Sequence, residues 1–405
     1  MVKPWNNAKI GDFLDFKNGL NKGKAFFGYG TPIVNYTDVY KKRGLKKNDV
    51  RGKVSLTRDE IHRFDAQKND VFFTRTSETP EEVGMPSVLL DDIDDCVFSG
   101  FVLRGRPKND MFAPEYCKYC FVTEAVRSAI IMGCTYTTRA LTNGKQLSAI
   151  EIVVPPKPEQ EAIAQSLTDI DELIFLLEKL VAKKKAIKQG AMQELLTGKK
   201  RLPGFSGDWI CAHIESCLTE KPSYGINAPA VDYNGFLPRY IRITDISEDG
   251  KYSKENQASV NAENVEPYIL KHNDIVLART GASVGKSYLY NEENGRLVYA
   301  GFLIKISIDP QKADSRLIFG VLHTHDYWKW VAQTSMRSGQ PGINGEEYAS
   351  YEFQMPSDLN EQKAIADILS NMGDEIEMLE KKLAKYRQIK QGMMQQLLTG
   401  KIRLV

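Results

Sequence analysis

Residues 159–202 read EQEAIAQSLTDIDELIFLLEKLVAKKKAIKQGAMQELLTGKKRL, and residues 361–404 read EQKAIADILSNMGDEIEMLEKKLAKYRQIKQGMMQQLLTGKIRL. Aligned without a gap at an offset of 361 − 159 = 202 residues, the two stretches are identical at 25 of 44 positions. The offset is about half of the 405-residue chain. The chain is therefore an internal duplication, and its two halves are expected to share one fold.

Both copies are expected to be long helices. Their apolar residues recur at alternating steps of four and three, which is the spacing of a coiled-coil seam. The expected seam residues are Ile163, Leu167, Ile170, Ile174, Leu177 and Val181 in the first copy and Ile365, Leu369, Met372, Ile376, Leu379 and Leu383 in the second. Prolines precede each stretch and Gly198 and Gly400 end them, as is typical of helix boundaries. Each helix should run for roughly 38 residues, or about 57 Å.

Two such helices in one chain are expected to form an antiparallel coiled coil, because a two-fold relation between the halves requires that direction. The alternative is that each helix is a core helix of its own domain. The length of the helices and the charged residues on their remaining surface favour pairing.

The segments before the helices are also related. NDVFFTRTS at 69–77 corresponds to NDIVLARTG at 273–281, and CVFSGFVLRG at 96–105 corresponds to LVYAGFLIKI at 297–306. Short β-like runs mixed with turns predict an α+β domain. The expected organisation is a globular domain over 1–155, a central long helix over 156–200, a second domain over 201–356 and a C-terminal long helix over 357–405, as a pseudo-two-fold internal repeat.

Composition excludes several classes of protein. The 54 Lys and Arg residues nearly balance 52 acids, so a basic surface must be local, as in the lysine-rich C-terminal halves of the two helices. No apolar run is long enough to span a membrane and no secretory signal is visible, so a cytoplasmic location is expected. Cys117 and Cys120 form an isolated CxxC pair without the further ligands that zinc needs, so neither a metal site nor a cofactor is expected.

The helices have kept their sequence while the loops of the domains have diverged. The first domain has TRTSETPEEVGMP and TYTTRALTNGK where the second has ARTGASVGKS and MRSGQPGINGE. Two copies of one scaffold with different loops are typical of a protein that recognises two different targets at a fixed distance from each other.

These motifs resemble the specificity subunits of type I restriction-modification systems over essentially the whole chain. The family pattern occurs twice, as PPKPEQEAIA with IKQGAMQELLTGKKRL and as PSDLNEQKAIA with IKQGMMQQLLTGKIRL. RTGASVGKSYLY and GQPGINGEEYASYEFQMP are similar to the family's target recognition domains. The first copy departs by a three-residue longer loop between Arg75 and Gly84 and by TTRAL in place of SGQPG.

The resemblance implies a non-catalytic subunit. Its two target recognition domains would each read one half of a split, asymmetric site in double-stranded DNA. The paired helices would act as a spacer and as the docking platform for two modification (methyltransferase) subunits, and restriction subunits would join through the complex.

A DNA reader needs cationic side chains for phosphates and amides, hydroxyls or Arg for base edges, carried on loops that enter a groove. The candidate DNA-binding residues are Arg75, Thr76, Arg139, Asn143 and Lys145 in the first domain and Arg279, Thr280, Ser283, Lys286, Arg337, Gln340 and Asn344 in the second.

Other functions fit less well. GASVGKS at 281–287 has three residues between its glycines where a Walker A loop has four, and the sequence after it reads as a strand rather than a helix. A methyltransferase would need an N/D-P-P-aromatic signature, but Pro155 and Pro156 lie between Val154 and Lys157. A coiled-coil structural adaptor without sequence-specific DNA binding would not need two domains with different loops.

Overall fold

The computed structural model describes residues 4–337 and 339–404. The chain divides into two compact units. Unit 1 comprises Met1–Glu178 and Lys382–Val405, and unit 2 comprises Lys179–Lys381. Each unit therefore contains one globular domain and one half of each long helix.

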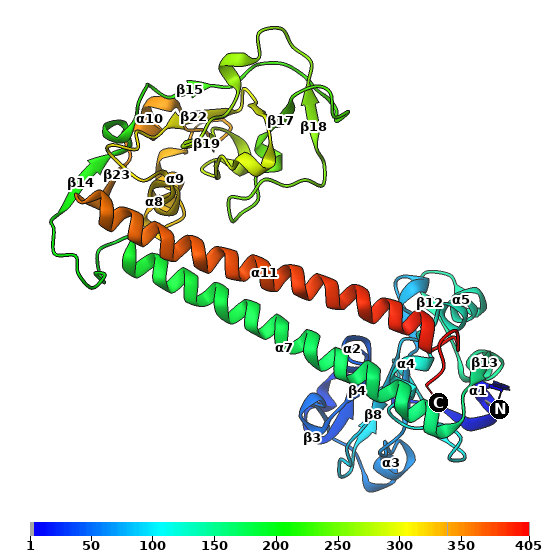
Figure 1. Cartoon of the computed structure of the whole chain (residues 1–405). Helices are drawn as coiled ribbons and strands as arrows, with labels where there is room; N and C mark the ends of the chain where they lie inside the picture. Colours follow the sequence, from blue (N-terminus) through cyan, green and yellow to red (C-terminus); the bar gives the residue numbers. More distant parts are fainter. Residues whose placement is uncertain (1–3, 338, 405) are drawn as a thin grey trace. The chain divides into compact units, whose positions relative to one another are not determined.

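The two long helices are present in full. Helix α7 spans Lys157–Leu195 and helix α11 spans Leu359–Leu397, with 39 residues each, and they are green and orange to red in Figure 1. Pro158, expected just before the first helix, instead lies in its first turn, where a missing N–H removes no intrahelical hydrogen bond. Gly198 and Gly400 follow the helix ends at φ of 70°, a left-handed conformation that glycine adopts without steric cost.

The globular domain of unit 1 combines small sheets with short helices. Its sheets have the strand orders β1-β13, β2-β10-β6-β8-β4, β11-β12-β7 and β5-β3-β9. The strands are β1 (Asn6–Lys9), β2 (Leu14–Asn18), β3 (Phe27–Val34), β4 (Gly44–Leu45), β5 (Gly52–Val54), β6 (Val71–Thr74), β7 (Thr76–Ser77), β8 (Pro86–Leu89), β9 (Val97–Phe98), β10 (Val102–Pro107), β11 (Thr135–Tyr136), β12 (Ala140–Leu141) and β13 (Glu151–Val154). The helices are α1 (Ile10–Phe13), α2 (Tyr36–Lys41), α3 (Arg58–Arg63), α4 (Cys117–Cys120), α5 (Glu124–Gly133) and α6 (Gly144–Ser148).

The globular domain of unit 2 has the same character. Its sheets have the strand orders β14-β23, β15-β22-β19-β20 and β16-β18-β17-β21. The strands are β14 (Trp209–His213), β15 (Ser223–Tyr224), β16 (Ala230–Asp232), β17 (Arg239–Ile241), β18 (Ala258–Val260), β19 (Asp274–Ala278), β20 (Ser287–Leu289), β21 (Leu297–Tyr299), β22 (Leu303–Ser307) and β23 (Glu352–Pro356). The helices are α8 (Ser315–Val321), α9 (His325–Thr334) and α10 (Gly345–Ala349).

The two domains repeat one topology. The antiparallel order β2-β10-β6-β8 of unit 1 corresponds to β15-β22-β19-β20 of unit 2. The parallel pair β3–β9 corresponds to β17–β21, and the pair β1–β13 that leads into α7 corresponds to β14–β23 before α11. The predicted α+β class and internal repeat are confirmed.

The first seam residues of each helix belong to the cores of the domains. Ile163 and Leu167 are fully buried in the core of unit 1, where they pack with residues that include Leu397 and Leu398 from the end of α11 and the turn after it. In unit 2 the core likewise includes Ile365, Leu369, Leu195 and Leu196. The alternative derived from the sequence, a helix within its own domain, therefore describes the beginning of each helix.

Further along the helices the seam is less completely covered. Ile170, Leu177, Val181, Ile376 and Leu383 are buried, and Ile174, Met372 and Leu379 are half-buried. This pattern is that of a two-helix contact, in which one face of each helix stays in water.

Within each unit the two helices run antiparallel. In unit 1, Asp171 pairs with Lys390 at 2.5 Å and Glu178 pairs with Arg387 at 2.6 Å, so positions rise along α7 as they fall along α11. In unit 2, Lys184 pairs with Glu375 at 2.7 Å, and Arg201 after the end of α7 reaches Glu361 near the start of α11 at 2.7 Å. The pairs at the start and end of the helices fix the same direction as those in the middle.

The Gln of each repeated Glu-Gln pair anchors its helix to the domain before it. The Gln160 amide accepts a hydrogen bond from the Ala113 N–H at 2.8 Å and donates to the Pro155 carbonyl at 2.9 Å. Gln362 accepts from the Asp314 N–H at 3.0 Å and donates to the Pro356 carbonyl at 2.8 Å. Both Gln side chains are buried, so the repeated sequence encodes the same anchoring contact in each unit.

The Glu of each pair binds an arginine that follows the C-terminal end of the other long helix. In unit 1, Arg403 binds the Glu159 carboxylate with two nitrogens, at 2.6 and 2.7 Å, and the Trp5 indole N–H donates to the same carboxylate at 3.0 Å. In unit 2, Arg201 binds Glu361 in the same bidentate way, at 2.7 and 2.8 Å. We call these two Arg–Glu contacts the clasps.

Cys117 and Cys120 lie in the core of unit 1, where burial raises the pKa of the Cys120 thiol. In the part of the chain that the structure describes, no group of three or more His, Cys, Asp or Glu side chains gathers where a metal ion could bind. Of the helices formed by the described residues, none is both long and apolar enough to cross a lipid bilayer.

Candidate nucleic-acid interface

In unit 2, the two loops predicted to read DNA meet at the end of β19. Arg279 and Thr280 directly follow this strand. The N–H of Ile343 donates to the Arg279 carbonyl at 2.9 Å, and the N–H of Gly281 donates to the Pro341 carbonyl at 3.0 Å. Main-chain hydrogen bonds therefore join the loop that carries Arg279 to the loop that carries Gln340, although about 60 residues separate them.

Unit 1 contains the same junction. The N–H of Thr142 donates to the Arg75 carbonyl at 3.0 Å, and Thr76 in β7 pairs with Leu141 in β12. Arg139 lies directly before β12 and is exposed. Arg75, Thr76 and Arg139 are thus brought to one place by a short antiparallel ladder.

Not all the candidate side chains are equally available. Lys286 Nζ forms an ion pair with Glu248 at 2.7 Å, and Arg337 forms one with Glu347. The Arg279 guanidinium lies over the Tyr224 ring, 4.7 Å from its centroid, in a cation–π contact that fixes its orientation. Gln340 is exposed and Ser283 is half-buried.

Asn143 and Asn344 begin equivalent short helices. Asn143 Oδ1 accepts from the Gln146 N–H at 3.0 Å, and Asn344 Oδ1 accepts from the Glu347 N–H at 2.8 Å. Each Asn is therefore an N-cap of α6 or α10, which explains why Asn-Gly recurs in both copies. Its Nδ2 group is not used by these capping bonds. Lys145, in the first turn of α6, is exposed.

A set of exposed aromatic side chains was not predicted from the sequence. In unit 1, Phe26 directly before β3 and Phe27 and Tyr29 in the first residues of β3 are exposed. In unit 2, Tyr233 and Phe236 are exposed between β16 and β17. The available signal was the run KAFFGYG, where aromatic residues alternate with turn-forming glycines and cannot all enter a core.

The glycine-rich stretch of unit 2 is not a phosphate loop. Lys286 is followed by strand β20, as the sequence predicted, whereas a Walker A loop leads into a helix. Gly285 has a φ of 89°, and a Cβ there would approach Val331 Cγ1 to 2.7 Å. The second glycine is thus required by packing against α9.

Several lysine and arginine residues in the cationic halves of the long helices form ion pairs with acids of the other helix. In unit 2, Lys185 pairs with Glu380 at 2.6 Å beside the Lys184–Glu375 pair, and unit 1 contains the Arg387 and Lys390 pairs described above. The lysine-rich end of each helix therefore faces acids of the other helix. Part of the local basic charge supports helix pairing rather than contact with a phosphate backbone.

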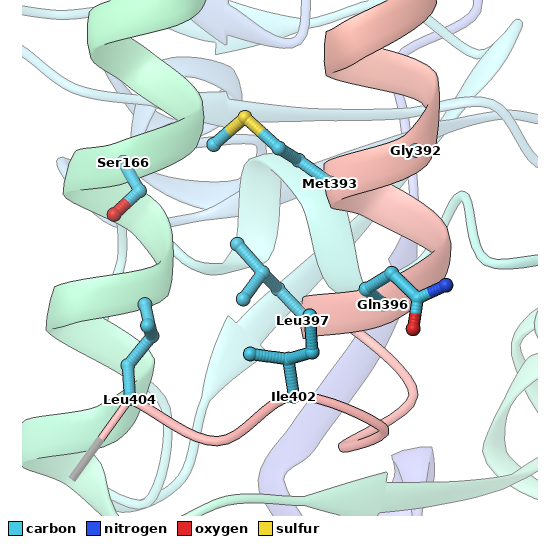
Figure 2. Close-up of a pocket in the computed structure, with 7 residues that line it drawn as sticks. All are labelled: Ser166, Gly392, Met393, Gln396, Leu397, Ile402 and Leu404. Atoms are coloured by element: carbon cyan, nitrogen blue, oxygen red, sulfur yellow. The ribbon is translucent and has the colours of Figure 1, made fainter.

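An apolar hollow of about 290 Å³ lies in unit 1 between the helices and the C-terminal residues. It is lined by Ser166, Gly392, Met393, Gln396, Leu397, Ile402 and Leu404 (Figure 2). At the corresponding place in unit 2 stand Glu194 and Lys200, which form an ion pair at 3.8 Å. The apolar lining is thus not repeated there, and it offers few polar groups that could orient a substrate.

A protein-family comparison matches the chain twice. Residues 2–189 and 216–387 match the family described as type I restriction modification DNA specificity domain. Each match covers most of one globular domain and of the long helix after it, so the two matches follow the internal repeat. The chain belongs to this family. It carries two DNA specificity domains of a type I restriction-modification system, and a purely structural adaptor is not favoured.

A curated relative and two solved structures agree over nearly the whole length. The type I restriction enzyme MjaVIII specificity subunit of Methanocaldococcus jannaschii is 25% identical over 424 residues, covering 99% of this chain and 93% of the relative. The crystal structure of the type I restriction-modification S subunit from M. genitalium has a TM-score of 0.62 at 14% identity, covering 98% of this chain and 96% of that one. A chain from a structure on complex assembly and conformational transition of the type I R-M system has a TM-score of 0.56 at 14% identity, covering 98% of both chains. These structures share the fold.

Proposed function

We propose that this chain is the non-catalytic specificity subunit of a type I restriction-modification complex in the cytoplasm. Each globular domain reads one half of a split, asymmetric site in double-stranded DNA, through the loops around Arg75 and Arg279. The paired helices set the spacing between the halves. Modification subunits carry out methyl transfer, restriction subunits join through the complex, and the chain itself needs no cofactor.

The observation that carries the proposal is the repeated frame with diverged loops. Equivalent hydrogen bonds, from Thr142 to Arg75 and from Ile343 to Arg279, hold the candidate loops in the same place in each unit. Beyond the shared Arg-Thr, the residues on those loops differ, as two unlike half-sites require, because sequence is read by side chains at base edges.

Exposed apolar residues on the long helices support two equivalent docking sites for modification subunits. Leu176 on α7 is 60% exposed, and Met378, which is 202 residues further on, is 66% exposed on α11. Ile187 and Ile389, also 202 residues apart, are exposed as well. Each unit therefore holds one residue of the Leu176–Met378 pair and one of the Ile187–Ile389 pair. All four residues lie outside the helix seam, where exposed apolar side chains favour contact with a protein partner.

Docking is tested by charge insertion. Leu176→Asp, Met378→Asp and the double variant are co-expressed with the modification subunit, and native mass spectrometry counts the subunits in each complex. Each single variant should lose one of two modification subunits, and the double variant both. Val153→Asp, at an exposed position of β13, is the control. Full stoichiometry in the double variant would contradict docking at these positions.

The function itself is tested by co-expressing the chain with the neighbouring modification gene in a host without such a system, followed by genome-wide mapping of methylated adenines. A bipartite motif that depends on this chain is the expected result. Methylation of an uninterrupted motif, or a motif unchanged when this chain is omitted, would overturn the proposal.

A further inference from the structure

Phe101 and Phe302 are exposed aromatic residues at equivalent places in the two units. They lie 201 residues apart, in the aligned stretches at 96–105 and 297–306. Phe101 is 55% exposed and Phe302 is 60% exposed. Neither core needs these rings, because most of each side chain is in water.

Both residues stand at the corner of a β-turn. In unit 1 the N–H of Val102 donates to the Ser99 carbonyl at 3.0 Å, which leaves Phe101 as the third residue of the turn between β9 and β10. In unit 2 the N–H of Leu303 donates to the Ala300 carbonyl at 2.8 Å, with Phe302 in the same position between β21 and β22. Turn corners are normally occupied by Gly, Pro, Asn, Asp or Ser, so turn formation does not account for a phenylalanine.

The turns are hydrogen-bonded to the main chain of two candidate DNA-binding arginines. The N–H of Arg75 donates to the Phe101 carbonyl at 2.9 Å, and the N–H of Arg279 donates to the Phe302 carbonyl at 3.0 Å. In unit 1 the turn is also held by a bond from the Gly100 N–H to the Leu20 carbonyl at 2.7 Å. The Arg75 guanidinium also donates to the Gly100 carbonyl of the turn at 3.3 Å. Each phenylalanine turn is thus directly bonded to a candidate DNA-binding arginine.

The two aromatic turns have remained alike while the loops next to them have changed. A residue that reads a particular base should differ between domains that recognise different half-sites. A residue that is the same in both copies, and that neither packing nor turn geometry requires, serves a feature that both half-sites share. The stacked base pairs of duplex DNA are such a feature, and the neighbouring arginines match its phosphate charge.

On the basis of the proposed function, we infer that Phe101 and Phe302 are DNA-contacting residues that insert as apolar wedges at a base step in each half-site. The turn presents the ring, and the adjacent arginine holds the turn in register with the base edges. Apolar wedges of this kind partly unstack a step and allow a closer fit of protein to DNA. The contribution is to affinity in both half-sites, with little choice of sequence.

The test uses the complex of the full chain with its modification subunits. Phe101→Ala, Phe302→Ala and the double variant are compared with Val153→Ala, a change at an exposed apolar residue of β13. Affinity is measured by fluorescence anisotropy on a duplex containing the mapped motif. Unstacking is measured with 2-aminopurine placed at successive positions of each half-site.

Each phenylalanine variant should bind roughly 5- to 100-fold more weakly, since loss of one aromatic contact to a base has that effect. The methylated motif should stay unchanged. The rise in 2-aminopurine fluorescence that reports unstacking should disappear only in the half-site read by the altered domain. The Phe101→Trp and Phe302→Trp variants should retain the DNA affinity that the Ala variants lose.

Unchanged affinity and 2-aminopurine signal in the double variant would overturn the inference. So would a changed base preference, which would make these residues base readers, or a loss of modification subunits, which would make them protein contacts. If the wild-type complex does not bind the motif at all, the proposed function fails instead.

Discussion

Asn344 combines a structural role that is visible in the fold with a proposed role in DNA binding. Its Oδ1 caps α10 through the Glu347 N–H, and the Glu347 carboxylate accepts from the Asn344 N–H at 2.8 Å. The equivalent Asn143 and Gln146 form the same reciprocal arrangement. A change at either Asn therefore affects stability as well as recognition, and the two effects need to be separated.

Asn344→Asp separates them. Asp retains the capping acceptor, so the free energy of unfolding should stay near the wild-type value, whereas Asn344→Ala should lose about 1 kcal/mol. The Asp variant should nevertheless bind DNA more weakly, because it removes the Nδ2 donor and adds a charge that phosphates repel. Denaturant unfolding and anisotropy titrations measure the two quantities. Wild-type affinity in Asn344→Asp would make this residue a cap alone.

The arginine loops should act independently of each other. Replacing Arg279, Thr280 and Ser283 with Ala should relax or abolish one half of the methylated motif, at about 1–3 kcal/mol for each lost base contact. Replacing Arg75 and Arg139 should affect the other half. Methylome mapping of both variants is the measurement. If the second-domain variant altered both halves equally, the proposed division between the domains would be wrong.

At the level of single residues, the sequence predicted which loops carry candidate DNA-binding residues, but neither that these loops meet nor which side chains are already paired. Arg75 and Arg279 could be aligned because strand, turn and arginine recur together. The ion pairs of Lys286 with Glu248 and of Arg337 with Glu347 could not be foreseen, since their partners depend on loop conformation. Phe101 and Phe302 were aligned within their stretches, but only the structure reveals that they are exposed.

Among the elements, the clasps explain why the repeated sequence continues past the helix ends to Arg201 and Arg403. Each clasp joins the chain that leaves one helix to the beginning of the other. Periodicity predicted the helices, but a contact between the first residues of one helix and the tail of the other follows only from antiparallel pairing. The retained Glu159 and Glu361 are buried, so their charges require such partners.

The Arg403→Ala variant should lower the free energy of unfolding of unit 1, since it leaves the buried Glu159 carboxylate without its cation. Arg403→Lys should recover only part of this loss, because lysine cannot bind the carboxylate with two nitrogens. Urea unfolding followed by Trp5 fluorescence measures the loss. The other tryptophans are replaced by Phe in every protein compared, including the reference that retains Arg403. Equal stability of the Ala and wild-type proteins would show that the clasp is unimportant.

The clasp also predicts a dependence on pH. The hydrogen bonds from Arg403 lower the pKa of Glu159, so this group stabilises the folded state above the ordinary Glu pKa. That contribution is lost as the pH falls through the lowered value. The stability difference between wild type and Glu159→Gln should therefore shrink as the pH falls below about 4. A difference that stays constant through this range would rule out an ionised Glu159 as the cause.

For the whole molecule, the duplication was sufficient to predict two long helices, the α+β class and the internal repeat. The strand orders themselves were not predicted from the sequence. The sequence could not predict that the first seam residues, such as Ile163 and Ile365, serve the domain cores, because core and coiled-coil positions share the same apolar spacing. The boundary between the compact units falls after Glu178 in α7 and after Lys381 in α11, two and three residues past the helix midpoints.

That boundary is the place to test whether the helix pair sets the spacing between half-sites. A seven-residue heptad inserted after both Glu178 and Glu380 should keep the seam in register, because seven matches the apolar repeat. Each helix would lengthen by about 7 × 1.5 = 10.5 Å. At 3.4 Å per base pair of B-DNA, the unread gap of the methylated motif should grow by about three base pairs, as an upper value, because the inserted turns also add twist.

A four-residue insertion is the matched control, because it breaks the alternation of threes and fours and turns apolar residues out of the seam. It should reduce methylation far more than the heptad does. Methylome mapping should find both half-sites of the heptad variant unchanged on either side of a longer gap. An active heptad variant with the original gap would mean that contacts outside the helix pair determine the spacing.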